Sequence, residues 1–183
     1  MTVASIARFE DNPPMIHRKA PDPIERQTGA TAGDTLQVAE GEVAIFARQG
    51  QLIRVLPTGS YTVPSEFAGP DMEVFFVTTA PQHGEKFGGQ LGIGLPVRMA
   101  FGQFTWVVRD PERAVTSAGF GDVSGFARWV TSTFMRELKI AVGRAHMAGE
   151  ALDGVHPRAI AKANEKLAAQ GIEILEVTEI QLR

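Results

Sequence analysis

The chain contains no cysteine, which excludes disulfide bridges, thiolate metal sites and cysteine nucleophiles together. It also lacks any apolar run close to the roughly 20 residues that cross a bilayer. Residues 1–20 contain no continuous apolar segment of the kind that a secretory signal needs. These absences fit a reducing compartment, and we expect the protein to be cytoplasmic.

The net charge is spread along the chain without a strong block of either sign. Lys and Arg number 18 against 21 Asp and Glu, and the formal net charge is −3. Because nucleic-acid binding depends on a concentrated basic face, we expect no nucleic-acid partner. Glu137 stands among the basic residues of the predicted long helix and favours a solvated helix surface over a lipid-binding one. These basic residues are Arg128, Arg136, Lys139 and Arg144.

Catalytic and metal-binding patterns are also missing. No Gly-x-Ser-x-Gly elbow or paired-carboxylate motif stands out. No two histidines are three or four residues apart, which argues against a metal site. We therefore expect no metal, no cofactor and no enzymatic activity. The only argument against a small-molecule hydrolase is that the sequence lacks a catalytic motif. The histidines are His17, His83, His146 and His156.

What the sequence does contain is a series of short apolar segments separated by Gly and Pro turns. The run MEVFFVT at residues 72–78 is almost wholly apolar, which predicts a strand buried on both faces. Residues 1–32 are rich in Pro, Asp and Thr, and we interpret them as an N-terminal arm with one short strand over residues 4–9. The spacing of the other early strands is typical of antiparallel hairpins, and they are predicted at residues 36–38, 43–47, 52–56 and 61–63.

The second half of the chain changes from strand to helix periodicity. Residues 81–94 interrupt the strands with five glycines, and the alternation that follows changes phase at Gly102, which predicts a bulge or bend. A helix is predicted from Asp122, a favoured N-cap residue, and a second from Pro157 to a cap at Gly171. The first has an apolar stripe of Phe126, Val130, Phe134, Leu138, Ala141 and Ala145.

The fold class expected from this order is α+β. It consists of a curved, mostly antiparallel sheet of short strands, from residue 36 to residue 108, followed by two helices and a final strand that returns to the sheet.

The glycine-rich run FGGQLGIGLPVRMA raises an alternative. Backbone amides of glycine turns can hold phosphate, and Arg98 stands eleven residues after Phe87. This is similar to the phosphate-binding segment of cyclic-nucleotide-binding barrels, although Gly89 replaces the acidic residue that those barrels use for the ribose. Two interpretations stay open: a cyclic-nucleotide sensor, and a plain connection that lets two strands pass closely.

The run VAEGEVAIFARQGQLIRVLPTGSYTVP resembles the opening of an SPFH (band 7) domain, which stomatins, prohibitins and flotillins share. GLPVRMAFGQFTWVVRDPERAV is similar to the strand pair of that family that ends in Asp-Pro-Glu-x-Ala, and the last strand resembles the end of the domain. We expect residues 33–183 to form the SPFH-like domain, closest to the soluble bacterial virion-core-like branch. The matching positions are Gly41, Val43, Phe46, Gly50, Pro57, Gly59, Tyr61, Asp110, Pro111, Glu112 and Ala114.

This resemblance implies a self-assembling scaffold and not an enzyme. SPFH domains are similar to one another in packing side by side into rings or cages, often at a membrane, where they organise or confine other proteins. The expected partners are therefore copies of this chain, together with a membrane surface or membrane proteins at the inner membrane face. No catalytic residue is carried over. The candidate interface residues are those of the turns, namely Gly41, Gly50, Pro57, Gly59, Tyr61, Asp110 and Pro111.

Overall fold

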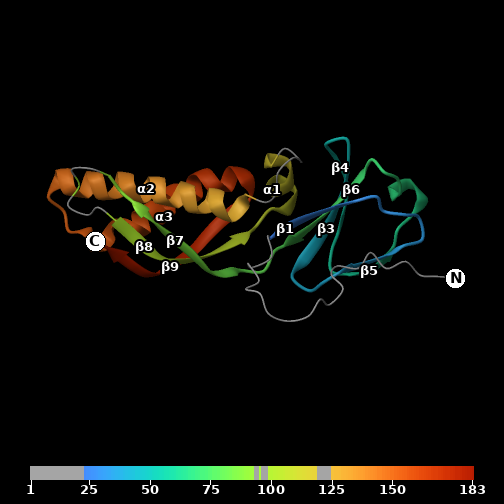
Figure 1. Ribbon diagram of the computed structural model, residues 1–183, viewed down its shortest axis with the longest axis horizontal. Coiled ribbons are helices and arrows are strands. Elements are labelled where there is room, and N and C mark those ends of the chain that lie inside the picture. The colour runs from blue at the N-terminus through green and yellow to red at the C-terminus, as the bar shows by residue number, and fades with distance from the viewer. Residues whose placement is uncertain (1–22, 93–94, 96–98, 119–124) are drawn as a thin grey trace. The chain divides into compact units, whose positions relative to one another are not determined.

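The structure, a computed structural model, describes residues 23–92, 95, 99–118 and 125–183 and has the α+β fold expected from the sequence (Figure 1). The chain separates into two compact units. Unit 1 comprises the described residues of Met1–Thr79 and Val115–Ser124, and unit 2 comprises those of Ala80–Ala114 and Gly125–Arg183. Residues 33–183 were expected to form one domain, whereas their described part divides between these two units.

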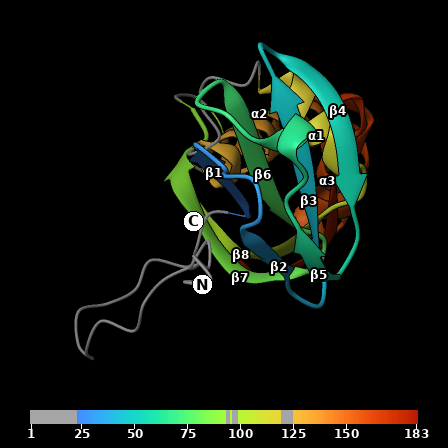
Figure 2. The ribbon, with the colours of Figure 1, turned by 90° about the vertical axis from the view of Figure 1, so that its right-hand side faces the viewer.

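Unit 1 is built from antiparallel strands in two sheets. Its larger sheet has the order β1-β6-β3-β4, and Figure 2 shows these strands side by side. Each pair within it is antiparallel. The smaller sheet pairs β2 with β5, and a short 3-10 helix, η1 (Ser65–Phe67), follows it. The strands are β1 (Ile24–Thr28), β2 (Thr35–Val38), β3 (Glu42–Arg48), β4 (Gln51–Leu56), β5 (Gly59–Thr62) and β6 (Met72–Thr78).

Strand β6 is buried on both faces, as its sequence predicts. Val74 and Phe76 belong to a cluster of buried residues from both sheets of unit 1. Phe75 and Val77, which alternate with them along the strand, are also fully buried. Phe46 packs against Phe67 in the same cluster, with ring centroids 5.1 Å apart. The other members are Ala30, Leu36, Val38, Ala44, Leu56, Val63 and Met72.

Unit 2 consists of a three-stranded antiparallel sheet with two helices. The sheet has the order β7-β8-β9, so the last strand of the chain pairs with β8, as expected. The strands are β7 (Gln82–Gln90), β8 (Met99–Val108) and β9 (Ile172–Leu182). The helical elements are α1 (Pro111–Ser117), which crosses the boundary between the units, α2 (Phe126–Ala148), η2 (Leu152–Gly154), α3 (Val155–Leu167) and η3 (Ala168–Gln170).

Aromatic rings join the long helix α2 to the sheet of unit 2. Phe134 lies with its ring centroid 5.0 Å from that of Phe87 on β7 and 6.0 Å from that of Phe104 on β8. All three side chains are buried. The predicted apolar stripe of α2 is buried as well, except for Ala141, whose place in the core is taken by Val142.

The prediction of a single sheet over residues 36–108 is wrong, because the strands divide into three sheets. The prediction of a break in the strands at residues 81–94 is wrong for its first part, since Gln82–Gln90 form β7. Within the expected arm of residues 1–32, Ile24–Thr28 form β1 and pair with β6. The expected strand over residues 4–9 and the N-cap Asp122 lie outside the described residues.

The bulge predicted at Gly102 lies on the neighbouring strand β9 instead. The two steps along β8 from Phe101 to Gln103 face three steps along β9, where Glu179 has a left-handed backbone with φ of 54°. Gly102 itself pairs with Phe87 of β7 without a register shift. A Cβ atom at Gly102 would lie 2.5 Å from the ring of Phe87 on β7. Because this ring occupies the space of a side chain, only glycine fits at position 102.

Candidate functional site

Four of the predicted interface residues meet at one end of unit 1. The turn before β3 contains Gly41, whose φ is 75°, and the turn before β5 contains Pro57. The Thr58 hydroxyl donates to the carbonyl of Ala39 at 3.0 Å and so joins the two turns. Tyr61 closes the second turn, because its hydroxyl donates to the Pro57 carbonyl at 2.9 Å while its ring covers Gly59.

Gly50 lies at the opposite end of β3, in the two-residue turn to β4. Gln49 and Gly50 have φ values of 52° and 77°, as a tight hairpin of this kind requires. The structure therefore does not bring Gly50 together with the other turn residues of unit 1.

Asp110 and Pro111 belong to unit 2 and begin helix α1. An Asp110 carboxylate oxygen accepts a hydrogen bond from the Arg113 amide at 2.9 Å, which makes Asp110 an N-cap, and Pro111 occupies the favoured first helical position. The amides of Arg109 and Asp110 donate to the Gly171 carbonyl at 2.7 and 3.0 Å. This pair therefore links the end of β8 to the start of β9, which is a structural role.

A small depression of about 300 Å³ lies beside this junction. Its charged groups are largely satisfied by one another, since Arg109 pairs with Glu173 at 2.6 Å and Arg113 with Asp110 at 3.4 Å. Such exposed pairs contribute little stability and leave few groups for a ligand.

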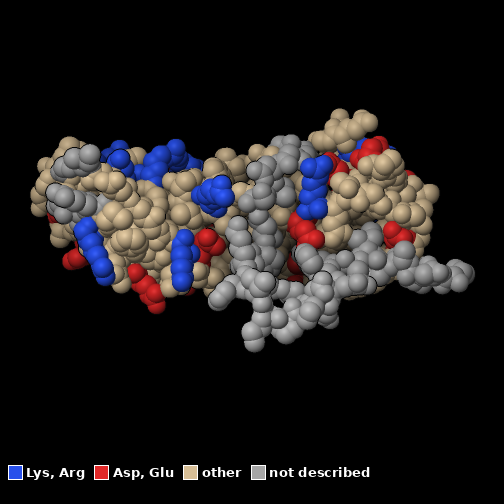
Figure 3. Space-filling view, viewed as in Figure 1, with Lys and Arg blue, Asp and Glu red and all other residues tan. Residues whose placement is uncertain are grey.

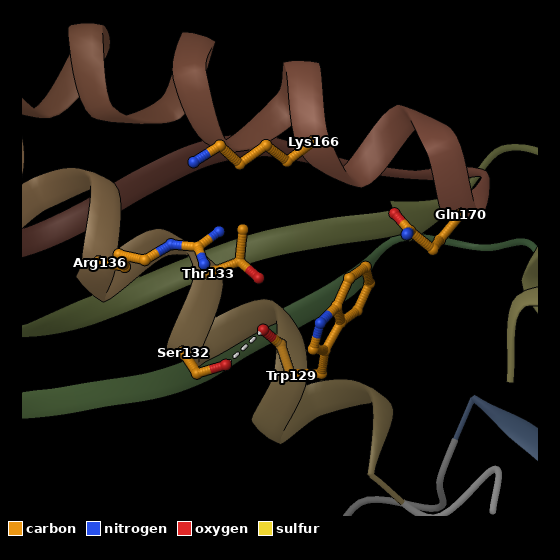
Figure 4. Close-up of a pocket in the computed structure, with 6 residues that line it drawn as sticks. All are labelled: Trp129, Ser132, Thr133, Arg136, Lys166 and Gln170. Carbon is orange, nitrogen blue, oxygen red and sulfur yellow. Dashed lines mark hydrogen bonds between the residues drawn. The ribbon is translucent and has the colours of Figure 1, made fainter.

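A larger pocket, of about 640 Å³, lies between α2 and the end of α3. We call it the helix pocket and define it by its lining residues, Trp129, Ser132, Thr133, Arg136, Lys166 and Gln170 (Figure 4). Arg136 and Gln170 extend from facing helical segments into the space between them, and the Trp129 ring stands beside that space. This pocket was not predicted from the sequence.

Glu137, which contacts two of the residues that line the helix pocket, is only 5% exposed. Its Oε1 accepts one hydrogen bond from Lys166 Nζ on α3 and another from Arg136 Nε at 3.3 Å. The Lys166 hydrogen bond lowers the pKa of Glu137 below its ordinary value of 4.5 and outweighs burial, which acts in the opposite direction. Glu137 is therefore ionised at neutral pH, and with two cations around one anion the pocket keeps one positive charge.

Several polar groups of the helix pocket have no partner among the residues that the structure describes. The Oε1 atom of Gln170 is buried without a hydrogen bond. Thr133 is 4% exposed, and its hydroxyl forms no hydrogen bond to a described residue. By contrast, the Ser132 hydroxyl already donates to the Trp129 carbonyl at 2.9 Å.

A signal for the helix pocket was present in the sequence. Glu137 falls between Phe134 and Leu138 on the apolar stripe of α2, and an acid at a buried helix position needs a charged partner nearby. Lys166, however, lies on another helix, 29 residues further along the chain. Helix periodicity predicts contacts only between residues of the same helix, so it could not identify this partner. Trp129 is half-buried and lines the pocket, whereas Trp106 is buried.

Charge is unevenly distributed between the helices and the last strand of unit 2. Residues 126–170 contain seven Lys and Arg against four Asp and Glu, whereas β9 contains three glutamates and no basic residue. Phe104 faces the helices, so Thr105 beside it faces away, and its hydroxyl donates to Glu176 at 3.3 Å. Glu173 and Glu179 are placed on this outer face as well, by their contacts with Arg109 and Gln103.

The segment behind the cyclic-nucleotide alternative is only partly described. Phe87 and Gly89 lie within β7 and pair with Gly102 and Ala100 of β8, so they form a strand and not a turn. Arg98 lies outside the described residues.

Two general features of the described part of the chain bear on membranes and metals. No helix there combines the length and the apolar character needed to cross a bilayer. Over the same residues, no group of three or more His, Asp or Glu side chains could hold a metal ion.

No protein-family model matches the sequence, and no curated protein matches it. The resemblance to SPFH domains therefore stays a prediction.

Proposed function

We propose that this protein is a non-enzymatic scaffold that associates with copies of itself and organises or confines partner proteins. The observation that supports it is the charge distribution of unit 2. The outer face of β9 carries glutamates, whereas α2 and α3, on the other face of the sheet, carry most of the basic residues, which gather over the helices in Figure 3.

These two faces favour a head-to-tail contact. An acidic face of one copy is complementary to the basic face of the next, and complementary charge guides association and sets the orientation of partners. A contact between two different faces leaves one free face on each end, so further copies add until a ring closes or a filament grows. The turns of unit 1, stiffened by the Thr58 and Tyr61 hydrogen bonds, are a second candidate contact surface.

Glu137, whose place among the basic residues favoured a solvated surface in the sequence, is buried and leaves the exposed helix surface basic. This surface supports a peripheral location at the cytoplasmic face of an anionic membrane. Each exposed Lys or Arg near such a surface contributes about 1 kcal/mol. Vesicles that contain phosphatidylserine should therefore retain the protein in a flotation experiment at low salt, whereas neutral phosphatidylcholine vesicles should not.

The experiment that tests self-association is a charge exchange between the two faces. One variant carries Glu176→Lys and Glu179→Lys, so that both of its faces are basic, and the other carries Arg128→Glu and Lys139→Glu, so that both are acidic. Light scattering over a concentration series should show that the parent protein associates and that each variant alone does not. An equimolar mixture of the two variants should associate again, because their faces are complementary.

Glu66→Lys serves as the matched control, since it changes the net charge equally per site but lies in the exposed helix η1 of unit 1, outside both candidate turns. It should associate like the parent protein. A parent protein that is monomeric at every concentration, with and without vesicles, would contradict the scaffold.

A further inference from the structure

We propose that the helix pocket binds a small aromatic carboxylate that also carries a hydroxyl or amino group. This ligand site is independent of the self-association proposed above, because it is derived from the unsatisfied groups of one cavity within unit 2. Its volume of about 640 Å³ lies within the range of small-molecule sites.

The carboxylate is assigned to Arg136. Its Nε is engaged by Glu137 at 3.3 Å, which orients the guanidinium, while its two terminal nitrogens form no hydrogen bond with the residues that the structure describes. Two parallel N–H groups at the end of an oriented guanidinium match the two oxygens of a carboxylate. The single positive charge left around Glu137 favours a ligand with one negative charge over a dianion.

The hydroxyl or amino group is assigned to Gln170. Its buried Oε1 is an acceptor without a donor, and a buried acceptor that stays unpaired is costly. Thr133 adds a hydroxyl that is 4% exposed and has no described partner, so it can donate to the ligand or accept from it. A ligand that is only an anion would leave Gln170 unpaired.

The aromatic ring is assigned to Trp129. The indole forms one wall of the helix pocket and is fixed edge-on by Phe126, with ring centroids 6.4 Å apart and planes at 80° (Figure 4). An aromatic ligand can lie against this wall in the offset or edge-on arrangements that aromatic pairs prefer.

Isothermal titration calorimetry with 4-hydroxybenzoate as the probe tests the proposal, with the indole N–H signal of Trp129 in NMR spectra as a second readout. Benzoate lacks the donor, 4-hydroxybenzyl alcohol lacks the charge, and inorganic phosphate lacks the ring. We expect 4-hydroxybenzoate to bind about tenfold or more tightly than each of the three.

Arg136→Gln should weaken binding of 4-hydroxybenzoate about 10- to 100-fold, because it removes a charge-assisted pair of hydrogen bonds. The Arg136 side chain is 60% exposed, so the variant should stay folded. Lys139→Gln is the matched control, since it removes one exposed cation from the same helix outside the pocket, and it should bind like the parent protein. Thr133→Val, of nearly equal shape, should weaken binding about threefold to tenfold.

Three results would overturn the site. These are binding of 4-hydroxybenzoate that Arg136→Gln leaves unchanged, phosphate that binds as tightly as 4-hydroxybenzoate, and no saturable binding by either readout up to ~10 mM.

Discussion

The side-chain amide of Asn164 pairs with both backbone hydrogen-bonding groups of Ile174. Asn164 Nδ2 donates to the Ile174 carbonyl at 2.8 Å, and Asn164 Oδ1 accepts from the Ile174 amide, also at 2.8 Å. The amide thus substitutes for a neighbouring strand at the outer edge of β9 and fastens α3 to it.

Asn164→Leu should therefore lower the free energy of unfolding by about 2–4 kcal/mol, because two partly buried backbone groups lose their partner. Urea denaturation measures the change. Glu165→Leu, at the exposed neighbouring position, is the control and should stay within about 0.5 kcal/mol of the parent. Equal midpoints for the two variants would show that the Asn164 bridge contributes nothing.

Gly171 and Gly149 allow two costs of replacing a glycine to be measured separately, namely the strain of a left-handed backbone and a steric clash of the added Cβ atom. Both cap helical segments, with φ of 71° and 67°, but a Cβ atom at Gly171 would lie 2.3 Å from the Asp110 carbonyl oxygen, whereas none lies near Gly149. Gly149→Ala should cost about 1–2 kcal/mol for the backbone alone. Gly171→Ala should cost about 2–5 kcal/mol, since overpacking adds to that. Thermal unfolding of the two variants measures the difference, and equal costs would contradict the close contact.

Phe134 is the centre of the aromatic contacts between α2 and the sheet. Phe134→Ala should lower the free energy of unfolding by about 3–5 kcal/mol, as deletion of a large buried side chain does. Ile140→Ala on the same helix is the control and should cost far less, because Ile140 is 40% exposed. An unchanged denaturant midpoint for Phe134→Ala would mean that this face of α2 is not in the core.

The lowered pKa of Glu137 predicts a pH dependence of stability. A carboxyl whose pKa is lower in the folded state stabilises the fold fully above its unfolded-state pKa, near 4.5, and loses that contribution as the pH falls through the folded-state value. The parent protein should thus lose stability below about pH 4.5 more steeply than Glu137→Gln, which cannot titrate there. Urea midpoints measured from pH 7 to pH 3 give the two slopes, and parallel slopes would refute the role of Glu137.

Local sequence patterns were sufficient to predict those features of the structure that depend on residues close together in the chain. The buried run of β6, the stripe of α2 and the cap at Gly171 were all predicted from spacing or residue type, because each reflects a local backbone or packing requirement.

Strand β7 shows why other parts were missed. Its sequence, QHGEKFGGQ, has three glycines and few residues that favour strands. The strand forms because Phe87 packs against Phe104 and Phe134, and a Cβ atom at Gly88 would lie 2.8 Å from the Phe101 ring. The helix pocket was missed for a similar reason, since Lys166 and Gln170 meet Arg136 only after α2 and α3 have packed.

The division into two units has a spectroscopic consequence. Both tryptophans of the chain, Trp106 and Trp129, lie in unit 2, and its single tyrosine, Tyr61, lies in unit 1. Tryptophan emission during denaturation therefore reports on unit 2, whereas the near-ultraviolet circular dichroism of Tyr61, whose hydroxyl is fixed to Pro57, reports on unit 1. Recorded on one sample, the two signals distinguish a single cooperative unfolding transition from two separate ones.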